Sequence, residues 1–115
     1  MALDAGDLSQ AETYHVKAIQ LRWELKDRVY MPYSLEELAE IALARGQFER
    51  AAKLLGSACV WRKRVGHALP PPLSERHRRR MDSLARKLGT ETLKACLVSG
   101  REMTDEEAYF YALSD

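Results

Sequence analysis

The chain states one short pattern twice: "GQFERAAKLLGSA" at residues 46–58 parallels "GDLSQAETYHVKA" at residues 6–18. Each copy begins with glycine, a polar residue and a large apolar residue. Alanines then follow at the same two offsets, Ala11 and Ala18 in one copy and Ala51 and Ala58 in the other. Helices pack closest where side chains are small, so the repetition predicts helical hairpins that bury their faces against one another.

Helical periodicity continues over nearly the whole chain, and no segment has the pattern of a strand. Glycines and prolines divide it into expected helices at about residues 7–26, 30 or 32–45, 47–65, 72–88 and 90–99, with another from 104 onward. Gly46, Gly66, Gly89 and Gly100 are each expected to end a helix, Gly46 as a left-handed cap. Thr104 with Glu107 three residues later predicts a capping box. The expected fold class is therefore all-α, in antiparallel helical hairpins with a C-terminal helical tail.

Length and composition indicate one soluble domain. The 115 residues suffice for one modest core. Neither a membrane-spanning apolar run nor a secretory signal is evident. The two cysteines, Cys59 and Cys96, form no CxxC pair, so we expect free thiols and a cytoplasmic location. Cys59 falls on an inward helical face and is expected to be a small core residue.

The tetratricopeptide repeat is the motif that these hairpins resemble. The residues at that motif's usual places are Leu35, Leu38, Ala39, Ala42, Gly46, Phe48, Ala51, Leu55 and Ala58, with Gly6, Leu8, Ala11 and Ala18 matching half of another copy. The period here is 40 rather than 34, and His15 and Leu35 depart from the usual residues. The resemblance implies a half repeat at 1–29, a full repeat at 30–66 and a helical tail at 67–115, all in a single domain 1–115.

The rest of the chain resembles the C-terminal repeat arm of large bacterial transcriptional regulators and signal-transduction ATPases. The matching residues are Leu55, Gly56, Ala58, Arg62, Gly66, Leu69, Pro70, Pro71, Leu88, Gly89, Gly100, Glu107, Ala108, Ala112 and Leu113. The resemblance implies an arm or sensor segment that acts as a non-catalytic scaffold. The chain carries no GxxxxGK[ST] phosphate loop.

No pattern of residues predicts catalysis, a metal or a cofactor. His15, His67 and His77 lack a further ligand at metal-binding spacing, and His77 falls within an apolar stripe, which indicates a packed histidine. Glu36, Glu37 and Glu40 are most simply a solvated helix face. We therefore expect no enzymatic activity.

Partner binding is expected on the first helix of the full hairpin, where Tyr30, Tyr33 and Glu37 are the candidate contacts for a protein or peptide segment.

The basic helix 76–87 gives the alternative function. The segment from Cys59 to Thr90 contains nine Lys or Arg residues and only two acidic residues, Glu75 and Asp82. Arg76, Arg78, Arg79 and Arg80 are able to dock phosphates, which makes a nucleic-acid-binding helical protein the alternative. An acidic protein partner stays open as well. The simplest interpretation is a solvated face, pairing with acidic flanks such as Asp105 and Glu106. Arg62 projects onto an apolar face, and we expect it to pair with a carboxylate or with helix C-terminal carbonyls.

The first expected helix carries two apolar sets. One set is expected to face the second helix. It includes Leu8, Ala11, Ala18 and Leu25, with either Tyr14 or His15 and either Leu21 or Arg22. The other set, Val16, Ile19 and Trp23, is expected to stay open. Exposed apolar patches tend to become interfaces, so this set predicts a homodimer through the N-terminal helix.

Overall fold

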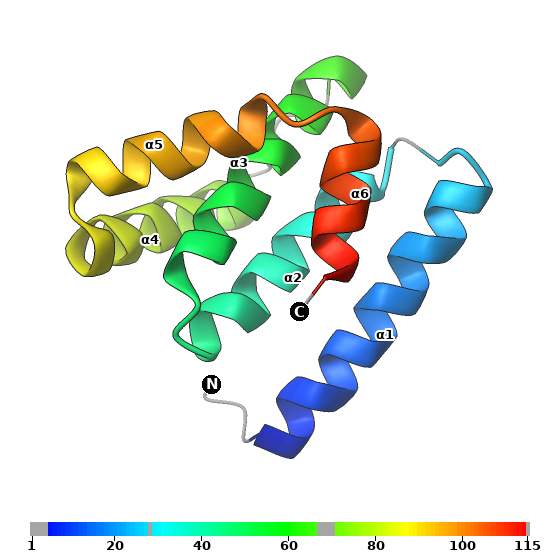
Figure 1. Ribbon diagram of the computed structural model, residues 1–115, viewed down its shortest axis with the longest axis horizontal. Helices are drawn as coiled ribbons and strands as arrows, with labels where there is room; N and C mark the ends of the chain where they lie inside the picture. The colour runs from blue at the N-terminus through cyan, green and yellow to red at the C-terminus, as the bar shows by residue number, and fades with distance from the viewer. Residues whose placement is uncertain (1–4, 28, 67–70, 115) are drawn as a thin grey trace.

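The computed structural model describes residues 5–27, 29–66 and 71–114, and over these residues the chain is all-α with no strand. Figure 1 shows the order of the elements. The helices are α1 (Ala5–Glu24), α2 (Met31–Ala44), α3 (Phe48–Val65), α4 (Pro71–Leu88), α5 (Thr90–Arg101) and α6 (Asp105–Leu113). None of the helices in this described part is long and apolar enough to cross a bilayer.

Most helix ends fall where the local sequence predicts them. Gly46 and Gly66 have φ of 78° and 72°, so both end their helices in the left-handed region that glycine adopts without strain. At the start of α6, Thr104 Oγ1 accepts the Glu107 N–H at 3.1 Å, and Glu107 Oε1 accepts the Thr104 N–H at 2.8 Å. This confirms the capping box.

Gly100 does not end a helix, contrary to the expectation from sequence. It lies inside α5, where a Cβ atom would stand only 2.0 Å from the Lys53 carbonyl oxygen of α3. Gly56 of α3 approaches the Leu97 carbonyl of α5 in the same way, at 2.4 Å from an added Cβ. The two glycines therefore allow the backbones of α3 and α5 to touch, and α5 ends one residue beyond Gly100, at Arg101.

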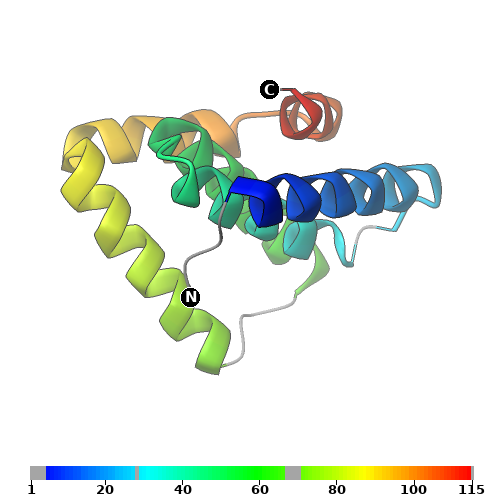
Figure 2. The same ribbon diagram turned by 90° about the horizontal axis from the view of Figure 1, so that it is seen from below.

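Four helices pack in succession: α1 on α2, α2 on α3, and α3 on α5. Figure 1 shows this succession from α1 at one side to α5 at the other. The remaining helix α4 contacts α3 and α5. Seen from below in Figure 2, the N-terminal end of α4 and the helix α6 lie toward opposite sides of the molecule. The core runs through the succession and extends to α4. Its fully buried side chains include Leu35 of α2, Leu54 and Leu55 of α3, and Leu84 of α4.

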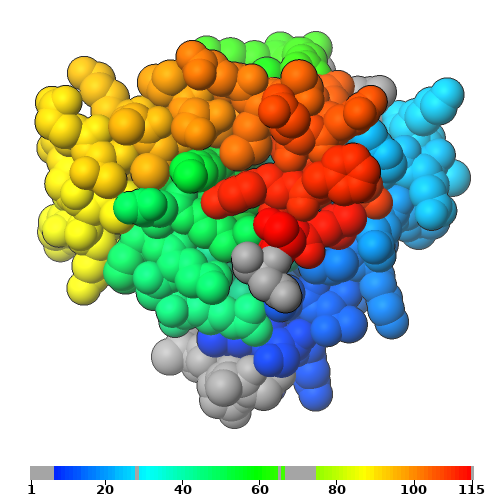
Figure 3. Space-filling model, viewed as in Figure 1, coloured from blue at the N-terminus to red at the C-terminus, as the bar shows by residue number. Residues whose placement is uncertain are grey.

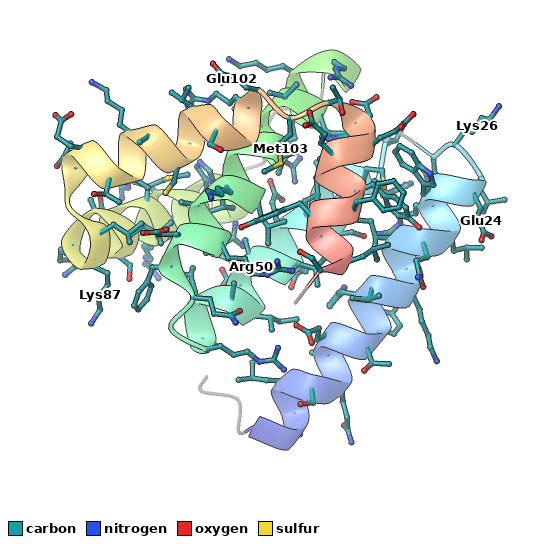
Figure 4. The ribbon with its side chains drawn as sticks, viewed as in Figure 1. Glu24, Lys26, Arg50, Lys87, Glu102 and Met103 are labelled. Atoms are coloured by element: carbon teal, nitrogen blue, oxygen red, sulfur yellow. The ribbon has the colours of Figure 1, made fainter. Side chains whose placement is uncertain are left out.

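The last helix returns the chain to α1. It contacts both α1 and α3, and in Figure 3 its surface lies between theirs. Tyr109 stacks on Trp23 of α1 with ring centroids 4.5 Å apart and planes within 5°. At the other end, Arg50 of α3 donates to the carbonyls of Tyr111 and Ala112 at 3.2 and 3.1 Å, and Figure 4 shows this side chain beside the end of α6. These contacts fix α6 between two helices that are far from it in sequence.

Candidate functional site

The outward face of α1 carries an apolar stripe that nothing in the described chain covers. Tyr14, Leu21 and Leu25 are 69%, 56% and 69% exposed, and the half-buried Ala18 lies among them. Leu25 directly follows the last residue of α1, and its backbone N–H still donates to the Leu21 carbonyl. The spacings of four, three and four residues place the four side chains within an arc of about 60° on an α-helix. We call these four residues the α1 stripe.

Exposed apolar side chains are concentrated at this end of the molecule. Seven large apolar residues are exposed in the part of the chain that the structure describes, and five belong to the α1 stripe or the connection that follows it: Tyr14, Leu21, Leu25, Val29 and Tyr30. Scattered single residues of this kind are normal on a protein surface, whereas a contiguous group marks an interaction site.

The structure corrects the assignment of the two apolar sets of α1. Ile19 is fully buried in the core, Val16 is half-buried against it, and Trp23 stacks on Tyr109. The expectation that Val16, Ile19 and Trp23 form an open face is therefore wrong, because α6 supplies cover for that side of α1. The open face belongs instead to Tyr14, Leu21 and Leu25, part of the set that was expected to face the second helix.

The three predicted contact residues of α2 do not share one environment. Tyr30 precedes α2 and is 54% exposed, whereas Tyr33 and Glu37 are half-buried. The Tyr30 and Tyr33 rings lie 5.9 Å apart. Arg62 of α3 lies over the Tyr33 ring at 4.4 Å, so Tyr33 already has a partner within the chain. Tyr30 lies in the connection between α1 and α2, where the Arg22 guanidinium lies 5.7 Å from the centre of its ring.

A buried ion pair joins α2 to α3. Arg62 Nε and Nη2 donate to the two carboxylate oxygens of Glu36, both at 2.6 Å, and both residues are buried. This confirms that Arg62 pairs with a carboxylate, and it corrects the interpretation of Glu36 as solvated. The hydrogen bond to Glu36 raises the pKa of Arg62 above its usual value, against the opposing effect of burial. Such a bidentate pair fixes the register of the two helices.

Glu40, one turn further along α2, forms ion pairs with the basic helix α4. Its Oε1 atom accepts from Arg80, which is buried, and from Arg76 at 3.4 Å. His77 lies beside this contact, and its buried Nδ1 atom has no hydrogen-bond partner. Burial lowers the pKa of His77, and the nearby Arg80 lowers it further. The acidic group that pairs with these two arginines is thus Glu40, whereas the expected Asp105 pairs with Arg64.

What remains exposed on α4 is a shorter basic surface than the sequence predicts. Arg79, Arg86 and Lys87 are exposed, and so is Arg76, although it shares Glu40 with Arg80. Arg78 is exposed too, but it pairs with Glu75 at 2.7 Å. Ion pairs therefore engage three of the four arginines between residues 76 and 80.

The histidines and cysteines of the described residues are the candidates for metal ligation and thiol chemistry. No group of three His, Cys, Asp or Glu side chains there could hold a metal ion. Cys59 and Cys96 are both free thiols, as expected, and burial raises the pKa of Cys96. His67, the third histidine, lies outside the described residues.

The chain matches no known protein family, and neither curated proteins nor solved structures contain a match.

Proposed function

We propose that this chain is a non-catalytic protein-interaction module that docks an amphipathic helix along the α1 stripe. The observation that carries the proposal is the clustering of exposed apolar residues on the outer face of α1, at the end of the helical succession. Because α1 already packs on α2 by its inner face, a further helix on its outer face would extend the same stacking.

The spacing of the stripe favours a helix over an extended peptide. Residues separated by four, three and four positions form the seam used when two helices pack along each other. An extended strand would instead seek an unpaired sheet edge, and the described chain contains no strand.

The helix whose charges match this surface is α1 of a second copy. Lys17 and Glu24 are exposed and flank the stripe on the same side. In an antiparallel pairing, Ala18 faces Leu21 of the other copy and Tyr14 faces its Leu25. Lys17 then lies beside the other copy's Glu24, and twofold symmetry repeats this contact. In a parallel pairing, Lys17 would instead lie beside Arg22 of the other copy, which carries the same charge.

Light scattering during size-exclusion chromatography of the full chain tests the proposal. We expect a concentration-dependent dimer at micromolar protein. The double variant Leu21→Glu with Leu25→Glu should be monomeric and retain the helical circular dichroism of the parent, because both residues are exposed.

The matched control is Val98→Glu, an exposed apolar residue on α5 that is 42% exposed. This variant should dimerise like the parent chain. A parent that stays monomeric at every accessible concentration would overturn the proposal, as would a dimer that survives the double variant.

The proposal extends to the arrangement of α2 and α3. We infer that α2 and α3 are one tetratricopeptide-like hairpin, supported by the turn at Gly46 and the small residues Ala51 and Ala58 in their packed faces. A module of this type suits the repeat arm of a bacterial transcriptional or signalling regulator, the class that the sequence resembles.

Nucleic acid binding through residues 76–87 is the less favoured alternative. Arg80 is buried against Glu40, and Arg76 and Arg78 form ion pairs with Glu40 and Glu75, which leaves Arg79, Arg86 and Lys87 for phosphate contacts. Binding to an oligonucleotide that weakens steeply with added salt would support this alternative.

A further inference from the structure

A pocket of about 170 Å³ lies where the end of α1, the α1–α2 connection and α3 meet. It is separate from the α1 stripe and has a different chemistry. The lining residues are Arg22, Trp23, Lys26, Asp27, Met31 and Trp61. Both tryptophans of the chain are therefore in its wall.

The apolar part of the wall is held in place. Met31 and Trp61 are 1% and 2% exposed, so they form the floor from within the core. The parallel stacking on Tyr109 of α6 fixes the Trp23 ring. The indole surfaces are thus preorganised, which lowers the cost of binding a flat apolar group.

Two cationic side chains reach the same pocket. Arg22 donates to Ser34 Oγ and lies over the Tyr30 ring, and its guanidinium carries five N–H donors in all. Lys26 is exposed and has a φ of 57°, a left-handed conformation that lysine rarely adopts. Figure 4 shows Lys26 at the end of α1.

The single acidic residue of the pocket is engaged in shaping the connection. Asp27 Oδ1 accepts the backbone N–H groups of Val29 and Tyr30 at 3.1 and 3.2 Å. The lining therefore combines two cations with one carboxylate that already accepts two hydrogen bonds.

We propose that this pocket binds the carboxylate of a small aromatic acid, with its ring against the tryptophans and its carboxylate toward Arg22 and Lys26. The size agrees, because an apolar cavity of about 150 Å³ holds one benzene ring. Most small-molecule sites share this composition, in which aromatic walls supply affinity and a few charged groups fix orientation.

Intrinsic tryptophan fluorescence tests the site directly, because no tryptophan lies elsewhere in the chain. Phenylacetate is the probe, and 2-phenylethanol and acetate are its neutral and ringless counterparts. Phenylacetate should change the emission saturably, with a Kd on the order of 1 mM or tighter, as befits about ten non-hydrogen atoms. The neutral alcohol should bind more weakly, and acetate should have no effect.

Lys26→Gln removes one of the cations without touching the core. It should weaken phenylacetate binding about two- to fivefold, the range for one exposed charge contact, and leave the alcohol unchanged. The matched control is Lys94→Gln, an exposed lysine on α5 that should leave both Kd values unchanged.

The tripeptide Gly-Gly-Phe and its C-terminal amide distinguish the two sources of an aromatic carboxylate. Tighter binding of the free tripeptide than of phenylacetate supports the site and identifies the C-terminus of a peptide as its ligand. Weaker binding supports it as a site for a free small acid. The proposal is overturned if phenylacetate produces no saturable change, or if acid and alcohol bind equally and Lys26→Gln affects neither.

Discussion

The two ends of the helical succession differ in what they present to solvent. The outer face of α1 exposes Tyr14, Leu21 and Leu25. The outer face of α5 carries one exposed large apolar residue, Val98, and is otherwise made of small, polar or charged residues: Glu91, Lys94, Ala95, Ser99 and Glu102. Helical stacks that end in solvent need a polar outer face. The α5 end meets this requirement and the α1 end does not, so α1 is where a further helix is expected.

The two ends also differ in how they are attached. The α5 helix joins α3 through backbone contact at Gly56 and Gly100. The α1 helix joins the rest through side chains, with Ile19 in the core and Trp23 on Tyr109. Adding a methyl group at the α5 end should therefore lower stability through a steric clash. Removing a side chain at the α1 end should lower stability by leaving a cavity.

The largest expected effect separates the two faces of α1. Ile19→Ala should lower the free energy of unfolding by about 2–5 kcal/mol, because Ile19 is fully buried and its removal leaves a cavity. Leu21→Ala, two residues away on the outer face, should change it by less than about 0.5 kcal/mol in the monomer. Urea unfolding at low protein concentration measures both. Equal losses would contradict the assignment of the faces.

At the α5 end, Gly100→Ala should cost about 1–3 kcal/mol, because the new methyl group would meet the Lys53 carbonyl and force the helices apart. The neighbouring Ser99→Ala is the control, since Ser99 is exposed and should tolerate the change. Thermal unfolding compares the two variants. A Gly100→Ala protein as stable as the control would show that α3 and α5 do not touch there.

The attachment of α4 differs from both ends because ion pairs and a buried histidine accompany its apolar contacts, and it should respond to pH. Arg80, Glu36 and Arg62 surround His77, and its pKa in the folded chain lies below the ordinary value. The unfolded chain therefore binds this proton more readily, so stability should fall as the pH is lowered through the usual histidine range. His77→Gln should flatten this dependence in urea unfolding measured at several pH values. An unchanged slope would show that His77 is not the group responsible.

The smallest expected effect tests the orientation of the α1 pairing. Lys17→Glu and Glu24→Lys should each weaken self-association about two- to fivefold, because each places like charges together. The double variant should restore the parent's affinity, since it only exchanges the two partners. Sedimentation equilibrium gives the constants. A double variant weaker than both single variants would exclude the antiparallel register.

The helices and most of their ends can be predicted from the sequence, because these features depend on residues that are close together in the chain. The capping box of Thr104 and Glu107 and the left-handed Gly46 are local features. Gly100 is misleading for the opposite reason, since Lys53, its neighbour in space, is far along the chain. Likewise a helical projection places Glu36 on a solvated face, whereas in the fold Arg62 of α3 packs against it and the two residues are buried together.

The candidate surface shows the same limit. The sequence reveals that α1 has two apolar sets, but it does not reveal which one stays open. That choice is made by α6, whose Tyr109 covers Trp23 from more than 80 positions further along the chain. Periodicity within one helix cannot contain this information, because both sets have helical spacing.

The central claim is that the α1 end is the open one, and a dilution series followed by nuclear magnetic resonance tests it most directly. Backbone amide shifts of the uniformly labelled chain would be recorded from high to low protein concentration. We predict that the amides that shift on dilution cluster between Tyr14 of α1 and Leu25, the residue after its end, and that those of α5 stay fixed. Shifts independent of concentration, or changes concentrated on α4 or α5, would contradict the account.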